Sequence, residues 1–150
     1  MELTDALDLR VIRIGVEACD KDDILHQLAG LLLDAAYIDD VEAFIRDVYL
    51  REAEGVTGIG GGIAIPHGKS STVDIPGIAI ATLKHPIEWE TLDGENVDTV
   101  FLFCVGDDLE AAHTHLVLLS KVAAKLADDE LVQRVRKAGT PEEVVRLLSA

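Results

Sequence analysis

The sequence predicts a single α/β domain in which helices flank both faces of a mixed central β-sheet. Its 150 residues suffice for one hydrophobic core, and 49% of them are hydrophobic. Strand-like and helix-like segments are interspersed along the chain with short connections, which is typical of α/β sandwiches. Two predicted helices follow one another within residues 21–54, so strand and helix do not alternate strictly. This break favours a mixed sheet over an all-parallel one.

The N-terminal part is predicted to form one strand and then two helices. Residues 9–17 are β-branched and partly alternating, which indicates a strand. Asp20 is placed to cap a helix over residues 21–36, where apolar side chains recur at helical spacing. The same spacing in residues 40–54 predicts the second helix, with Arg51 near its C-terminal end.

The C-terminal part is predicted to form two further strands followed by helices. Residues 78–83 are strand-like, and the longest apolar run, residues 97–105, has the composition of a fully buried strand. An apolar stripe predicts an amphipathic helix over residues 114–127. Thr140 and Glu143 have the spacing of a capping box at the start of the last helix.

Charge, apolar runs and cysteine usage exclude several classes of function. Thirteen Lys and Arg against 28 Asp and Glu give a formal net charge of -15, which disfavours nucleic acid and anionic membranes as partners. The apolar runs are shorter than the roughly 20 residues of a spanning helix, and the acidic N-terminus lacks the features of a signal peptide. We therefore expect a cytoplasmic protein without membrane insertion. Cys19 and Cys104 match no zinc-binding spacing and are expected to be buried free thiols.

The segment TGIGGGIAIPHGK, residues 57–69, carries the clearest functional signal. Its glycines permit backbone conformations and close anion contacts that other residues prevent. Isoleucines occupy positions at which a dinucleotide fingerprint or a P-loop requires glycine, so neither motif is present. Pro66 is expected to end a strand sharply and to present His67 on a stiff support. A neutral imidazole held in this way suits nucleophilic attack on phosphorus; a turn histidine without chemistry is the alternative.

Three further side chains are candidates for an anion site. His113 and His115 are expected at the start of the 114–127 helix, where free amides and the helix dipole favour negative charge. Arg51 has the planar fork that pairs with phosphate, although a surface ion pair with a neighbouring glutamate is an alternative. Solvated histidines are the alternative for the helix pair. A metal-dependent hydrolase built on His67, His113 and His115 is a separate possibility.

Together, these motifs resemble the fructose/mannitol-type enzyme IIA domain of the phosphoenolpyruvate-dependent sugar phosphotransferase system, including its nitrogen-regulatory branch. The resemblance is carried by REAEGVTGIGGGIAIPHG and by THLVLLSKVAAKLADDELVQRVRKAGTPEEVVRLL, which occur in the family's order. It extends over nearly the entire chain, so one such domain is expected over residues 1–150.

The resemblance implies a phosphotransferase component with a phosphohistidine intermediate. In this scheme His67 accepts a phosphoryl group on Nε2 from the histidine-containing phosphocarrier protein and passes it to a cysteine of an enzyme IIB. His115 matches the family's second active-site histidine, and Arg51 matches an arginine near the phosphorylation site. The scheme requires no metal, nucleotide or other cofactor. The alternative is a nitrogen-related regulatory protein whose phosphorylation switches its binding to other proteins.

The same resemblance makes the glycine-rich segment a loop around the phosphoryl group. The residues assigned to this loop are Thr57, Gly58, Gly60 and Gly68. Many family members have asparagine where this chain has Gly61, so a side-chain contribution from that position is absent here.

Overall fold

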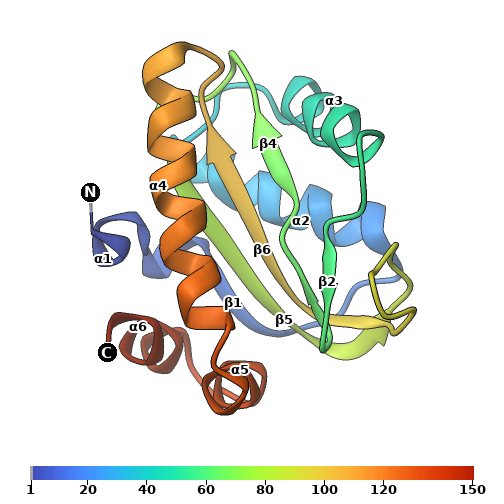
Figure 1. Cartoon of the computed structure of the whole chain (residues 1–150). Helices are drawn as coiled ribbons and strands as arrows, with labels where there is room; N and C mark the ends of the chain where they lie inside the picture. Colours follow the sequence, from blue (N-terminus) through green and yellow to red (C-terminus); the bar gives the residue numbers. More distant parts are fainter. Residues whose placement is uncertain (1) are drawn as a thin grey trace.

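A six-stranded mixed sheet forms the centre of the computed structural model, which describes residues 2–150 (Figure 1). The path through the sheet is β1-β5-β6-β3-β2, and β4 pairs with β6 beyond β3. β1, β3 and β4 pair in parallel, whereas the β5–β6 and β2–β3 pairs are antiparallel. The predicted mixed sheet is therefore confirmed. The strand bounds are β1 Ile12–Val16, β2 Gly58–Gly60, β3 Ile63–Ala64, β4 His67–Lys69, β5 Gly77–Ile87 and β6 Val97–Val105.

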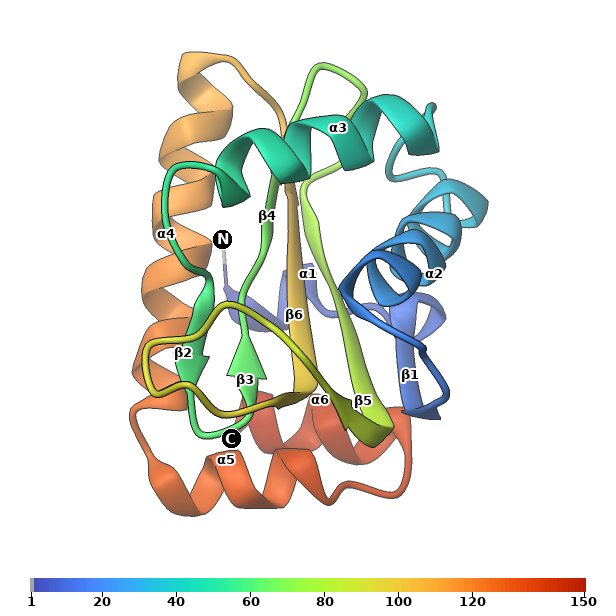
Figure 2. The ribbon, with the colours of Figure 1, turned by 90° about the vertical axis from the view of Figure 1, so that its right-hand side faces the viewer.

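Helices cover both faces of this sheet, as predicted (Figure 2). One face is covered by α2, Lys21–Asp34, and α3, Val41–Glu52. The other face is covered by the short N-terminal helix and the three C-terminal helices: α1 Leu3–Ala6, α4 Leu109–Leu126, α5 Asp129–Arg136 and α6 Pro141–Ser149. Successive residues of β6 alternate between the two cores, with Leu102 facing α2 and α3 and Phe103 facing α4.

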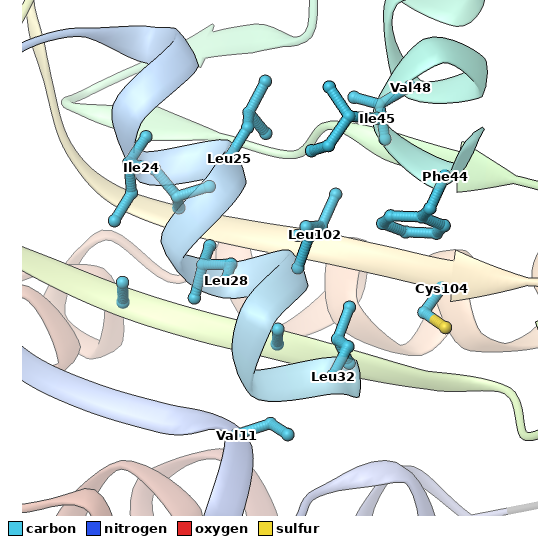
Figure 3. Packing of buried hydrophobic residues seen from close by; sticks show 14 of the residues in the cluster. Val11, Ile24, Leu25, Leu28, Leu32, Phe44, Ile45, Val48, Leu102 and Cys104 are labelled. Atoms are coloured by element: carbon cyan, nitrogen blue, oxygen red, sulfur yellow. The ribbon is translucent and has the colours of Figure 1, made fainter. Parts of the chain in front are cut away.

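The core under α2 and α3 consists mainly of aliphatic side chains, with Tyr37, Phe44 and Trp89 as its aromatic members; part of it is drawn in Figure 3. Leu25, Leu28 and Leu32 of α2 lie against the sheet beside Phe44 of α3. Cys104 of β6 is part of this core, and burial raises the pKa of its thiol to about 12. The sequence also predicted a buried thiol at Cys19; this prediction is wrong, because Cys19 is exposed.

Capping residues explain where the helices begin. The Asp20 side chain accepts a hydrogen bond from the Asp23 amide at the start of α2, as expected from the sequence. Thr140 likewise accepts from the Glu143 amide at α6. The Glu143 carboxylate returns to the Gly139 amide rather than to the amide of Thr140, so the predicted capping box is shifted by one residue.

Helix α4 begins five residues before the predicted position. Asp108 caps it by accepting a hydrogen bond from the Ala111 amide, and the first helical residue is Leu109. His113 and His115 therefore lie beyond the first turn, where the amides are already paired within the helix. The expectation that they stand at a helix N-terminus is wrong.

Two strand boundaries also differ from the sequence prediction. Leu9–Val11 forms a 3₁₀ turn, so β1 is shorter than residues 9–17, and β5 extends to Ile87 rather than to residue 83. A strand, β3, does end before Pro66, at Ala64, but His67 is the first residue of a new strand, β4. Pro66 lacks an amide hydrogen, but its carbonyl accepts a hydrogen bond from the Phe103 amide, so pairing with β6 continues past it.

Gly68 allows α3 to lie directly on β4. In this strand His67 and Gly68 point to opposite faces, and a Cβ atom on Gly68 would overlap the ring of Phe44 in α3. The absent side chain at this position therefore sets how closely α3 approaches the strand that carries His67.

We expect Gly68→Ala to lower the free energy of unfolding by about 1–3 kcal/mol, because the added methyl group overpacks the Phe44 contact. Gly30→Ala is the matched control, because Gly30 lies within α2 and a Cβ there has no described neighbour within 4 Å. It is expected to raise the unfolding free energy by roughly 0.5–1 kcal/mol through helix propensity. Chemical denaturation of both variants measures the difference, and equal stability of the two would contradict the close-approach role.

Candidate functional site

A pocket of about 350 Å³ lies where α3, β4 and α4 meet. Three elements that are far apart in the sequence contribute to it. The lining residues are Asp47, Leu50, Arg51 and Glu54 from α3 and the turn after it, His67 and Lys69 from β4, and His115 from α4. The structure thus brings together His67, His115 and Arg51, the three side chains that the sequence singled out.

His67 and His115 are in direct contact at the base of this pocket. Their ring centroids are 4.7 Å apart, and the rings are nearly perpendicular, at 87°. Phe103 of β6 lies beneath both, with ring centroids 5.2 Å from His67 and 5.8 Å from His115. Because Phe103 is fully buried, it supplies an apolar floor that restricts where the two imidazoles can lie.

The Nε2 atoms of both imidazoles are buried and make no hydrogen bond within the described chain, although His115 as a whole is only partly buried. His67 is only 6% exposed. Within residues 2–150, neither the Nε2 atom of His67 nor that of His115 has a hydrogen-bond partner. An unmet buried polar atom costs about 1–3 kcal/mol, so two in one pocket call for an explanation beyond stability.

The surroundings keep both histidines uncharged at neutral pH. Burial lowers the pKa of His67 to about 4, and the nearby His115 and Arg51 contribute to the same shift. Burial also lowers the pKa of His115, with further contributions from Lys69 and Arg51. A neutral imidazole has one nitrogen with a free lone pair, so His67 has the electronic form of a nucleophile over the physiological pH range.

Arg51 and Lys69 provide the positive charge around the two rings. Arg51 lies in the last turn of α3 and donates a hydrogen bond from Nη1 to the carbonyl of Gly55 at 3.3 Å. The neighbouring Glu52 is paired with Lys21 at 3.2 Å instead. Among residues 2–150 no carboxylate lies within 4.0 Å of the Arg51 guanidinium, so the surface ion pair considered from the sequence is not present.

Lys69 was not named as a site candidate from the sequence, because no strand was predicted at its position. The structure instead places Lys69 in β4, two residues beyond His67 on the same face of the strand. The signal that could have identified it is this two-residue spacing in a strand that begins at His67.

Thr57 lies outside the pocket and belongs to a separate buried network. Its hydroxyl donates to the Glu52 carboxylate at 2.8 Å and accepts a hydrogen bond from Trp89 Nε1 at 3.2 Å. Lys21 completes the network by pairing with Glu52 and lying 4.9 Å from the Trp89 ring. These contacts tie the C-terminal end of α3, and so the segment around Arg51, to the rest of the fold.

Gly61 and Gly62 form the turn between β2, which contains Gly58 and Gly60, and β3, at the opposite end of the sheet from α3 (Figure 2). Gly58 packs against the backbone of residues 90 and 91, where a Cβ would overlap Thr91. Gly60 and Gly61 have positive φ angles of 96° and 64°, and the Gly61 amide donates to Asp93 at 3.0 Å. None of these glycines lines the pocket of His67, and Gly68 faces α3.

His113 is exposed on α4 and does not line the pocket. No group of three or more His, Cys, Asp or Glu side chains in residues 2–150 is arranged to hold a metal ion. The donor set considered for a metal-dependent hydrolase is therefore not assembled by this fold. None of the helices in that range is both long and apolar enough to span a bilayer.

Comparison with known proteins connects this fold to the sugar phosphotransferase system. A family model described as "Phosphoenolpyruvate-dependent sugar phosphotransferase system, EIIA 2" matches residues 5–150. The crystal structure of the nitrogen regulatory protein IIA-Ntr from Neisseria meningitidis superimposes with a TM-score of 0.86 at 27% identity, covering 97% of both chains. The fold is thus that of the phosphotransferase-system IIA class. The chain belongs to the EIIA 2 family of that system.

Two curated relatives from Escherichia coli represent the two branches of this family. The nitrogen regulatory protein is 38% identical over 150 residues, covering 99% of this chain and 90% of that protein. The PTS system 2-O-alpha-mannosyl-D-glycerate-specific EIIABC component is 36% identical over 149 residues, again 99% of this chain. The present chain spans only 22% of the length of that second relative.

We expect an NMR pH titration to give His67 a pKa near 4, against an ordinary value of 6.5, because burial and nearby positive charge disfavour its protonated form. The unfolded chain then binds the proton more readily than the folded chain. The His67 contribution to unfolding free energy is present above about pH 6.5 and is lost as pH falls through about 4. Arg51→Gln should raise the His67 pKa while leaving it below 6.5, whereas a wild-type pKa at or above 6.5 would contradict this description of the site.

Proposed function

We propose that the protein accepts a phosphoryl group on Nε2 of His67 from a histidine-containing phosphocarrier protein and passes it to a cysteine of an enzyme IIB during sugar uptake. One observation carries the proposal: the neutral, unpartnered Nε2 of His67 shares a pocket with His115 and Arg51. Membership of the EIIA 2 family supplies the direction of transfer.

The chemistry of both steps is a displacement at phosphorus. In the first step the Nε2 lone pair of His67 forms the new N–P bond while the N–P bond of the donor breaks, and the donor imidazole leaves with the electron pair. In the second step a thiolate of enzyme IIB forms an S–P bond, and the electron pair of the His67 N–P bond returns to Nε2. The Nδ1 proton of His67 is retained throughout, so neither step needs an outside base.

His115 and Arg51 have supporting roles in this proposal. In the tautomer with hydrogen on Nε2, His115 can donate a hydrogen bond to a phosphoryl oxygen beside His67. The Arg51 guanidinium offers a positive fork to the same group. The positive charge of Arg51, which helps to disfavour protonation of His67, also favours a bound dianion, because a cation repels the imidazolium and attracts the phosphoryl group. The glycine-rich segment instead forms β2 and its turn to β3, while Thr57 holds the end of α3 through Glu52.

The acceptor is inferred from the relatives. The name of the mannosyl-glycerate relative joins A, B and C components in one protein, which fits a IIA unit that works beside a IIB unit. A second candidate is a regulatory protein whose phosphorylation alters its binding to other proteins. The near full-length match to the nitrogen regulatory protein favours this alternative, because that relative is nearly all IIA-like domain.

We expect incubation with phosphoenolpyruvate, enzyme I and the phosphocarrier protein to place one acid-labile phosphate on His67, as measured by mass spectrometry. His67→Ala should remove the label, because the Nε2 atom proposed to bond to phosphorus is then absent. His115→Gln should slow labelling by roughly 100-fold, the usual loss when one donor to a transferring group is removed. His113→Gln is the matched control on α4 and should label like wild type; full labelling of His67→Ala would exclude the proposal.

Onward transfer separates the two candidate functions. We expect the labelled chain to lose its phosphate to the active-site cysteine of at least one enzyme IIB in a panel of purified proteins. A phosphate that stays on His67 with every IIB, together with partner binding that depends on the phosphate, would instead favour the regulatory protein.

A further inference from the structure

Lys69 is an exposed cation in the pocket of His67 that the family resemblance does not assign. It follows His67 by two residues in β4, so both side chains project from the same face of the strand. Gly68, between them, faces Phe44 on the other side. Because β4 is paired with β6 from His67 to Lys69, the backbone fixes the two positions from which these side chains leave the strand.

The ammonium of Lys69 has no ion-pair partner in the described part of the chain, residues 2–150, although the chain carries 28 acidic residues. Lys84, another exposed strand lysine, pairs with Glu17 at 3.2 Å. The positive charge of Lys69 acts on His115 and helps to lower the pKa of that histidine.

The charge of the pocket requires a second cation if a phosphoryl group is to rest there. Asp47 and Glu54 line the pocket beside Arg51 and Lys69. Without Lys69, one positive group would face two carboxylates and a phosphoryl dianion. With Lys69 the protein charges in the lining balance, and the two cations approach from different elements, α3 and β4.

We propose that Lys69 is a phosphate-binding residue of this site, and that its ammonium and the Arg51 guanidinium hold the oxygens of the phosphoryl group while it is bonded to His67. This inference rests on the proposed function and adds a contact to it. The ammonium acts as a mobile point charge on a flexible stem, which complements the fixed fork of the arginine. The contact stabilises phosphohistidine by neutralising its charge and leaves the N–P bond formation itself to His67.

The first test uses inorganic phosphate as the probe and requires no phosphotransfer. Phosphate is titrated into the whole chain while the ring C–H signals of His67 and His115 are followed by NMR. We expect Lys69→Gln to weaken phosphate binding roughly tenfold, the scale of one lost charged hydrogen bond, and Lys69→Arg to restore most of it. Lys84→Gln is the matched control and should bind like wild type. Equal affinity in Lys69→Gln and wild type would overturn the inference.

The second test measures the phosphorylated form. Phosphoramidate serves as a small donor: its N–P bond breaks, ammonia leaves, and the Nε2–P bond of His67 forms. We expect Lys69→Gln phosphohistidine to hydrolyse several-fold faster than wild type and Lys69→Arg to hydrolyse at close to the wild-type rate, with unchanged unfolding midpoints. Equal lifetimes would overturn the inference even if His67 is labelled. If the phosphocarrier protein fails to label wild-type His67, the proposed function fails, while the phosphate titration still decides the role of Lys69.

Discussion

The parallel pairing of β4 with β6 is the constraint on which the site depends. Its register places His67 opposite Phe103, Gly68 opposite Cys104 and Lys69 opposite Val105. This register therefore places the imidazole of His67 against the Phe103 ring, the backbone of Gly68 under α3, and the ammonium of Lys69 at the edge of the pocket. A shift by one residue would exchange the two faces, burying the lysine side of the strand against Phe44 and turning the imidazole away from α4.

Burial gives the two histidines their chemical character. In water an imidazole is partly protonated near neutral pH, and its nitrogens are satisfied by solvent. Here burial against Phe103, together with nearby positive charge, keeps the rings neutral and leaves two Nε2 atoms without a hydrogen-bond partner in the described structure. The fold bears a local cost in stability to keep them in this state, and the proposed transfer is the process that would use them.

Sequence patterns identified most of the fold because its periodicities are strong. The buried strand at residues 97–105, the Asp20 cap and the mixed sheet all follow from local composition and spacing. The start of α4 was missed because its first turn does not continue the buried apolar stripe: Leu109, its first residue, faces solvent. The strand at His67 was missed because Pro66 is normally a boundary, and only the amide of Phe103, distant in sequence, shows that pairing resumes.

The candidate site was predicted in part. The resemblance grouped His67, His115 and Arg51, which the tertiary structure does bring together. Adjacency in the chain did not reveal that the glycine turn lies at the far end of β3. The segment of five residues between Gly61 and His67 includes β3 and carries the turn away from the pocket. Lys69 was missed because it lies on the same face as His67 only if residues 67–69 form a strand, and Pro66 argued against a strand there.

The unequal burial of the two cysteines gives the protein one natural attachment point for a probe. Cys104 is enclosed in the core with a thiol that stays protonated, whereas Cys19 lies exposed in the connection between β1 and α2. A maleimide dye would accordingly react at a single place in the unmodified chain. Fluorescence from that label could report association with other proteins without any engineered residue near the pocket.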